Sequence, residues 1–455
     1  MKIRVDNLGV IHTAEVSTAG LLTVFNGPNS TGKTYLSYLL YHLLSDDSYI
    51  DLEIYDSLLG NRYGDNSLEF TYSKDMVDYF LNEQANRVRE ELGLLFGIAN
   101  DKAGSLFSRT VLNFFISEEE FSYNKHISYK INAKYNSYVF VINLNYEQGK
   151  VKIEKVDPKP IPELESGKIW KFLICQAIRR IALLPIGKSW MLTVERNSIY
   201  TFANELTNYR LMDDGILPDD NIVRLGEFGP RRYPLAIRRS LRYASELENI
   251  KQGRSDYYEF AVELERRLLH GNIETTENGE LEFLVETAES EKRLPIHLTS
   301  SIVKAMASLI LYLKYSARPN DVILIDEPEM NLHPDNQVML ARIFGELVNQ
   351  GLRLIVSTHS DYIVREFNNM MMGKELQRAE DTSYINYGLT DSVLLDRRYV
   401  NVYSFVVSLG EHVDVVPVEL DRFGFAVSSI DDTIQRQNDM TDTLHDILQF
   451  EHPEV

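Results

Sequence analysis

An eight-residue stretch near the start of the chain constrains the fold more than any other feature. It fits the pattern G-x-x-x-x-G-K-[ST] without a mismatch and reads Gly27, Pro28, Asn29, Ser30, Thr31, Gly32, Lys33 and Thr34. The apolar run at residues 21–25 is typical of a buried strand, and residues 35–40 indicate a buried helix. A strand, this loop and a helix in that order form a phosphate-binding unit, which requires an α/β fold around it.

The residue types of this loop suit a nucleoside triphosphate. Glycines let backbone N–H groups turn inward around phosphate oxygens, and the following helix points the positive end of its dipole at them. Lys33 can reach the β- and γ-phosphates, and the Thr34 hydroxyl can ligate Mg²⁺. A chance glycine-rich turn is the alternative, and roughly one or two chains in a hundred of this length would match by accident. We therefore predict binding of ATP and Mg²⁺ at residues 27–34, with Thr34 as a metal ligand.

The composition restricts the cellular compartment and the classes of binding partner that we expect. The net charge of −20 over 455 residues disfavours a general coater of nucleic acid, because an acidic surface repels phosphates. A local basic surface and a basic partner protein both remain open. The single cysteine, Cys175, lies in an apolar run and excludes an internal disulfide framework. No apolar run has the length of a membrane span or a signal peptide, so we expect a cytoplasmic protein without a membrane partner.

The chain before residue 158 has mixed character. Strands are predicted over residues 2–5, 9–16 and 21–25, and apolar spacing over residues 74–98 indicates a helix. Three alternating runs predict a small antiparallel sheet, at residues 127–133, 138–145 and 150–156.

Three prolines, Pro158, Pro160 and Pro162, then predict a boundary in the chain. Beyond them the pattern is mainly helical, over residues 169–184, 198–212, 235–250 and 257–270. A hairpin is predicted from residues 272–275 and 281–285. This region is either a helical lid inserted into the core or an arm that projects from it.

A second buried strand carries two carboxylates. Residues 322–325 are uniformly aliphatic and end in Asp326 and Glu327. Such a run is typical of a central parallel strand, and ligands bind at the ends of such strands. Asp326 is expected to hold Mg²⁺, and Glu327 to polarise the water that attacks the γ-phosphate. In isolation, the same pattern would be a strand with a solvated acidic end.

A third buried strand, residues 352–358, ends at His359 about 30 residues further on, with a helical stretch between. That spacing fits a βαβ unit, which places both strand tips at one edge of the sheet. A lone histidine is more often structural. At this edge, however, His359 can donate a hydrogen bond to the γ-phosphate. We predict Lys33, Glu327 and His359 as the catalytic residues.

These motifs together resemble one group of ATPases. The loop, Asp326-Glu327-Pro328, Leu332-His333-Pro334 and Ser357-Thr358-His359-Ser360 are similar to ABC/SMC-type ATPases. The resemblance is to the stand-alone bacterial branch that includes the overcoming-lysogenisation (OLD) family and ATPase subunits of the anti-phage systems PARIS and Septu. It covers residues 1–45 and 290–370. It implies an α/β P-loop NTPase fold of ABC/SMC type with an inserted mixed β and helical region.

The resemblance also implies a homo-oligomer, at least a dimer, in which two protomers sandwich two ATP molecules. Ser300 and Ser301, at the start of a predicted helix, would meet the nucleotide of the other subunit, although the usual signature glycines are absent. His333 replaces the usual D-loop aspartate, and Gln84 is a weak Q-loop candidate. Arg196 is similar to a Glu-Arg element of the branch and is equally a structural ion-pair residue.

Members of the overcoming-lysogenisation family carry a C-terminal nuclease domain, whereas only residues 371–455 follow the last motif here. We therefore expect a docking region, and an ATPase sensor that controls a separate effector in anti-phage defence. An SMC-like ATPase acting directly on DNA in repair or chromosome maintenance is the alternative. Arginines at positions 231–242 would contact nucleic acid or pair internally.

The chain thus divides into five predicted parts. They are the N-terminal core with the P-loop (1–75), a mixed helix and antiparallel β part (76–157), the mainly helical lid or arm (158–290), the C-terminal core (291–370) and the docking region (371–455).

Overall fold

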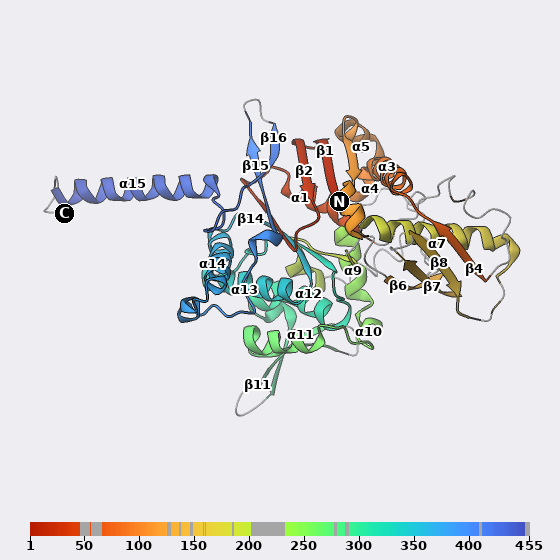
Figure 1. The fold of residues 1–455 in the computed structure, drawn as a ribbon. Coiled ribbons are helices and arrows are strands. Elements are labelled where there is room, and N and C mark those ends of the chain that lie inside the picture. The colour runs from red at the N-terminus through yellow and green to blue at the C-terminus, as the bar shows by residue number, and fades with distance from the viewer. Residues whose placement is uncertain are drawn as a thin grey trace.

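A nine-stranded mixed sheet forms the centre of the computed structural model (Figure 1). The structure describes residues 1–45, 55, 66–124, 129–135, 138–145, 149–157, 159, 161–183, 186–201, 233–276, 280–286, 291–408 and 412–450. The strand order is β5 (Val111–Phe115), β1 (Lys2–Leu8), β2 (Ile11–Ser17), β16 (Val413–Pro417), β15 (Val400–Val407), β3 (Leu22–Asn26), β14 (Arg353–Thr358), β13 (Val322–Asp326) and β9 (Ser189–Leu192). From β15 to β9 all neighbours are parallel.

Helices cover both faces of the parallel half. Strands β3, β13 and β14 are buried at every position, as their uniformly apolar sequences predict. Leu324 packs in the apolar cluster that holds α1 (Lys33–Leu44), and its neighbour Ile323 packs in the cluster on the opposite face. That second cluster contains α12 (Ser301–Tyr315), α13 (Pro334–Asn349) and α14 (Asp361–Arg378). The predicted α/β class with its P-loop unit is therefore confirmed.

A second, antiparallel sheet lies beside the first in the order β4 (Ser67–Thr71), β8 (Lys150–Lys155), β7 (Tyr138–Asn145) and β6 (Tyr129–Tyr135). The three predicted strands are present, and β4 adds a fourth. The helix predicted over residues 74–98 is divided into α3 (Lys74–Glu90) and α4 (Leu92–Phe96). Two short helices follow them, α5 (Asn100–Phe107) and α6 (Glu118–Asn124).

The region expected to be a lid or arm contributes to the core. Helix α7 (Glu163–Leu183) buries Trp170 in the same cluster as α1, and β9 pairs with β13. The region continues as α9 (Leu235–Ser245), α10 (Leu247–Ile250), α11 (Tyr258–Leu264), a π-helix (Glu265–Leu269) and a three-stranded sheet of β10 (Asn272–Thr275), β11 (Leu281–Glu286) and β12 (Glu291–Pro295). Most of the helix predicted over residues 198–212 lies outside the described residues.

The C-terminal region, which was predicted to be a docking region, also supplies two strands of the central sheet. Strand β15 lies directly between β3 and β16, because its apolar side chains such as Val402 and Phe405 fill the two faces of the sheet. The last helix, α15 (Ser428–Phe450), extends away from the body (Figure 1). Within the described residues, no helix is both long and apolar enough to cross a bilayer.

Candidate functional site

The predicted P-loop joins β3 to α1 and requires glycine at two places. Gly27 has φ 143° and Gly32 has φ 92°, values that residues with a side chain rarely adopt. A Cβ at Gly27 would lie 2.8 Å from the carbonyl oxygen of Phe405, and one at Gly32 would lie 2.8 Å from Cγ1 of Ile11. The loop is thus closely packed from behind, while Pro28, Asn29 and Ser30 stay exposed at its tip.

Lys33 begins α1 and turns back into the loop. Its ammonium donates to the carbonyl oxygens of Gly27 at 2.9 Å and Pro28 at 2.7 Å, and the residue is 5% exposed. The Thr31 hydroxyl donates to the Pro28 carbonyl at 2.8 Å. Burial lowers the pKa of Lys33, and the charges of Glu327 and Asp326 oppose that shift. The ammonium is therefore already held within the loop, where phosphate oxygens would offer it better acceptors.

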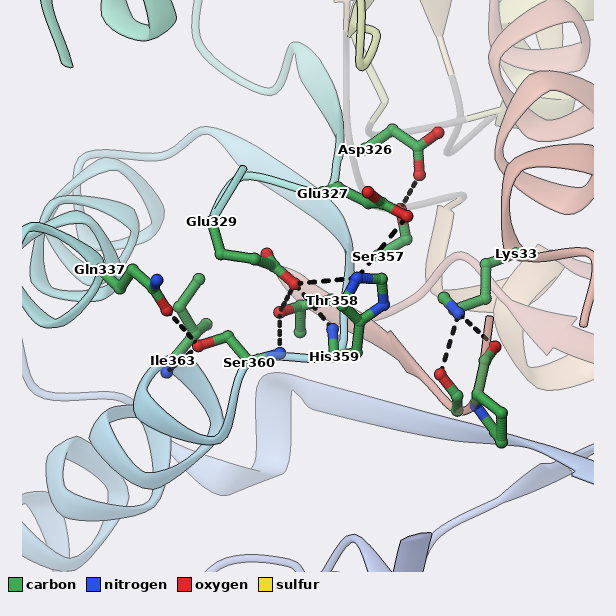
Figure 2. A network of polar contacts seen from close by, with 12 residues as sticks. Lys33, Asp326, Glu327, Glu329, Gln337, Ser357, Thr358, His359, Ser360 and Ile363 are labelled. Atoms are coloured by element: carbon green, nitrogen blue, oxygen red, sulfur yellow. Dashed lines mark hydrogen bonds and ion pairs between the residues drawn. The ribbon is translucent and has the colours of Figure 1, made fainter. Parts of the chain in front are cut away.

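Asp326 ends β13 directly opposite the start of α1. Its Oδ2 accepts from the Thr34 hydroxyl at 2.8 Å, and its Oδ1 accepts from the Ser357 hydroxyl (Figure 2). The carboxylate and the Thr34 hydroxyl are hard oxygen donors of the kind Mg²⁺ prefers, so this pair fits the predicted metal site. Among the described residues there is no cluster of three or more His, Cys, Asp or Glu side chains able to hold a metal. Phosphate and water oxygens would complete the coordination.

Burial raises the pKa of Asp326, and the hydrogen bonds from Ser357 and Thr34 act in the opposite direction. An acid whose pKa is raised in the folded state contributes stability that is fully present below its unfolded pKa and is lost as pH rises through the folded pKa. Ionised Asp326 therefore lowers the free energy of unfolding at neutral pH. A bound cation would offset this penalty.

Glu327 has a backbone conformation that is rare for a residue with a side chain, with φ 45°. Its N–H donates to the Ser357 carbonyl at 3.0 Å, which extends the pairing of β13 with β14 by one residue. Its Oε1 lies 3.7 Å from Nε2 of His359 (Figure 2). The predicted water-activating carboxylate and the predicted γ-phosphate contact are thus neighbours at one sheet edge, close to Lys33 and Asp326.

Arg196 is a site residue whose role the sequence left open. It is 3% exposed and follows β9. Its Nη1 donates to the carbonyl oxygens of Thr193 at 3.1 Å and Asp326 at 2.8 Å, and its Nη2 donates to that of Glu327 at 2.7 Å. The guanidinium thereby holds the backbone of both acidic residues, including the left-handed one. The sequence signal was only the Glu-Arg pair after an apolar run.

Replacing Arg196 with Lys is expected to reduce ATP hydrolysis about 10- to 100-fold, because the two acidic residues would lose their fixed positions. It should also lower the free energy of unfolding by about 2 kcal/mol. The lysine ammonium cannot reproduce the forked hydrogen bonds of the guanidinium, and it leaves a buried carbonyl unpaired. Phosphate release and urea unfolding measure the two effects. Arg254→Lys, an exposed arginine, is the control. Normal hydrolysis by the Arg196 variant would contradict this role.

His359 is held by its backbone as well as by its place after β14. Its N–H donates to Oε1 of Glu329 at 2.8 Å, and its Nε2 lies 3.9 Å from the same oxygen. The His359 side chain is 32% exposed. The ring therefore remains partly accessible to a ligand while its main chain is fixed.

Ser300 and Ser301 are not part of this cluster within one protomer. Ser300 is the N-cap of α12 without a side-chain hydrogen bond to the helix, and both residues are exposed. No hydrogen bond in the described part of the chain joins either serine to residues 27–34. An exposed helix start is available to a second subunit.

The weak Q-loop assignment of Gln84 is wrong. This residue is 1% exposed within α3, and its Nε2 donates to the Leu43 carbonyl at 3.5 Å. Leu43 lies near the C-terminal end of α1, whereas the P-loop precedes its N-terminal end. Gln84 therefore packs a helix end and does not reach the site.

The arginine cluster points largely inward. Arg238 donates to the Leu94 carbonyl at 3.2 Å, and the Arg239 guanidinium lies 5.4 Å from the ring centre of Tyr41. Arg242 is exposed and forms an ion pair of 2.8 Å with Glu246. These three side chains therefore do not form one free face for phosphates. Arg231 and Arg232 lie outside the described residues.

Comparisons with known proteins give one extensive match. The family model described as "AAA ATPase domain" matches residues 1–364. No curated protein matches the chain.

Among solved structures, an SMC head bound to the C-winged helix domain of ScpA is 12% identical, with a TM-score of 0.36 over 92% of this chain and 98% of that one. The SMC head domain from Thermotoga maritima is 10% identical, with a TM-score of 0.34 over 92% and 98%. The Smc head domain with an extended coiled coil, bound to the C-terminal domain of ScpA derived from Pyrococcus furiosus, is 10% identical, with a TM-score of 0.32 over 97% and 98%. These are distant likenesses.

Proposed function

Because this chain belongs to the AAA ATPase domain family, we propose that it binds MgATP in the P-loop and hydrolyses it to ADP and phosphate. The observation that supports this most directly is the position of Glu327, whose carboxylate lies 3.7 Å from His359 beside the Thr34–Asp326 pair. Phosphate release by the purified chain with Mg²⁺, and its loss on chelation with EDTA, tests the proposal.

Each residue has a separate task in this reaction. Lys33 and the backbone N–H groups of the loop bind and orient the β- and γ-phosphates. Thr34 and Asp326 would hold Mg²⁺, which would neutralise charge that develops on the phosphate oxygens. Glu327 orients the attacking water and accepts its proton. His359 donates a hydrogen bond toward the γ-phosphate, so that its contact is lost once phosphate leaves.

We further propose that two protomers enclose the nucleotides between them. Two features support this arrangement: the exposed start of α12, and the Ser300 side chain that forms no hydrogen bond to its own helix. Hydroxyls and N–H groups at a helix N-terminus suit the γ-phosphate of a partner's ATP. The assembly would then depend on whether ATP or ADP is bound.

For the biological role, we propose a sensor subunit in anti-phage defence that controls a separate effector, a nuclease. The sequence resemblance to the ATPases of such systems motivates this role. Helix α15 offers the docking surface, since Met440, Leu444 and Leu448 are 58%, 54% and 54% exposed. Their spacing places them with Ile447 on one helical face, whereas three aspartates lie on the other side, Asp439, Asp442 and Asp446.

Truncation after residue 427 is expected to release the effector without loss of ATP hydrolysis, because α15 extends away from the site. Affinity purification from the native host, followed by mass spectrometry, should find a nuclease encoded by a neighbouring gene with the full chain only. A combined change of Met440, Leu444, Ile447 and Leu448 to Ser should have the same effect. Changing Asp439 and Asp442 to Ser is the matched control. Retention of the nuclease by the truncated chain would contradict this docking site.

A further inference from the structure

Glu329 is a buried acid in the site to which the sequence pattern gave no role. It follows Pro328 in the turn after β13, and its side chain is 10% exposed. One of its oxygens, Oε1, accepts from the His359 N–H at 2.8 Å and from the Thr358 hydroxyl at 2.9 Å (Figure 2). The carboxylate thus binds two consecutive residues of the loop that carries the imidazole.

The second oxygen of Glu329 is left without a partner. Oε2 is buried and forms no hydrogen bond within the described structure. A buried carboxylate that uses only half of its acceptor capacity is expensive to keep, typically about 1–3 kcal/mol or more. An amide or a hydroxyl at this position would accept the same two hydrogen bonds with less desolvation. Stability alone therefore does not account for an acid here.

The loop is fixed on its other side as well. The Ser360 N–H donates to the Thr358 hydroxyl oxygen at 3.0 Å, and the Ser360 hydroxyl donates to Oε1 of Gln337 at 2.5 Å. The Gln337 amide donates in turn to the Leu332 carbonyl at 2.9 Å. The residues on both sides of His359 are therefore hydrogen-bonded to the segment that follows Glu327. Among these hydrogen-bond partners, Glu329 is the one that carries a charge and approaches the ring.

Glu327 and Glu329 both approach the same ring nitrogen of His359. Nε2 of the ring lies 3.7 Å from Oε1 of Glu327 and 3.9 Å from Oε1 of Glu329. The Glu327 side chain is 30% exposed, whereas that of Glu329 is 10% exposed. Nε2 thus lies near both carboxylates, and Glu327 is the more accessible of the two to water.

We propose that Glu329 is a positioning residue that fixes the orientation of His359 toward the γ-phosphate. It acts through the His359 main chain, the Thr358 hydroxyl and its charge near Nε2 of the ring, and it does not contact the nucleotide. This inference rests on the proposed ATPase function and extends it to a residue outside the recognised motifs. It assigns catalysis to Glu327 and alignment to Glu329, two acids that are separated by a single proline.

A double-mutant cycle tests this inference. Glu329→Ala is expected to reduce kcat about 10- to 100-fold, which is typical of a misplaced group, while ATP affinity changes little. In a His359→Ala background the same change should have almost no further effect, because its route to the reaction is gone. Thr358→Val should give a smaller loss of kcat, and Thr358→Ser, which keeps the hydroxyl, should behave as the parent. Equal losses of kcat in both backgrounds would overturn the proposal.

A second measurement does not depend on activity. Histidines labelled with ¹³C at Cε1 report the surroundings of each ring, and loss of a signal in the His359→Ala variant identifies the signal of interest. Glu329→Gln keeps the shape of the side chain and should shift that resonance, whereas Glu375→Gln should not. An unchanged His359 resonance would reject the positioning role. A parent protein that hydrolyses no ATP would contradict the proposed function instead, and the resonance would still decide the role of Glu329.

Discussion

ATP binding by the Lys33→Ala variant is expected to be at least about 100-fold weaker than that of the parent, because the variant loses a charge-assisted contact to two phosphates. The ammonium is preorganised for this task, since Lys33 already lies in the loop with two carbonyl acceptors. Isothermal titration calorimetry with MgATP measures the effect.

The same change should affect the stability of the nucleotide-free protein little. Burial lowers the pKa of Lys33, so its charge is held at some energetic disadvantage in the folded state. Thermal unfolding of the variant without nucleotide checks this point, and Lys102→Ala, at an exposed lysine, controls for a general loss of charge. An unaltered ATP affinity of the Lys33 variant would contradict the proposal that the P-loop binds MgATP.

Glu327→Gln is expected to lower kcat about 10²- to 10⁴-fold, the range for loss of a general base. The amide keeps the shape of the side chain, and Arg196 still holds the Glu327 carbonyl at 2.7 Å, so ATP should bind almost normally. Bound ATP would then persist. If ATP holds two protomers together, the variant should elute as a larger species with ATP than with ADP in size-exclusion chromatography.

Glu419→Gln, at an exposed acid, is the control for that experiment. Comparison of Glu327→Gln with Lys33→Ala separates two steps, since the first variant should bind without turnover and the second should not bind. A Glu327 variant with normal kcat would show that another group activates the water.

The sequence predicted the parts of the site that depend on local pattern. The loop, the carboxylate pair and the late histidine each follow a buried strand, and parallel strands place their ends at one edge. The structure brings Lys33, Asp326, Glu327 and His359 together there (Figure 2). The role of each in binding and hydrolysis remains a prediction.

The parts that were not predicted depend on contacts between distant segments. Nothing in the local pattern of residues 400–417 reveals that they enter the sheet beside β3, because strand pairing follows from tertiary packing. The hydrogen bonds of Arg196 to main-chain oxygens cannot be predicted from residue types, because every residue has a backbone carbonyl that can accept one. Glu329 was likewise indistinguishable from a solvated acid until its burial was known.

The place of β15 has a consequence for how this protein is made. Strand β3 pairs with β14 on one side and with β15 on the other, so the segment that precedes the P-loop needs residues 400–404 before its pairing is complete. A ribosome synthesises the chain from its N-terminus, and β3 therefore emerges almost 380 residues before its last neighbour. The nascent chain must keep this apolar strand from aggregating until residues 400–404 have emerged. The pairing of the strand before the P-loop is therefore completed only after β9, β13 and β14 have been synthesised.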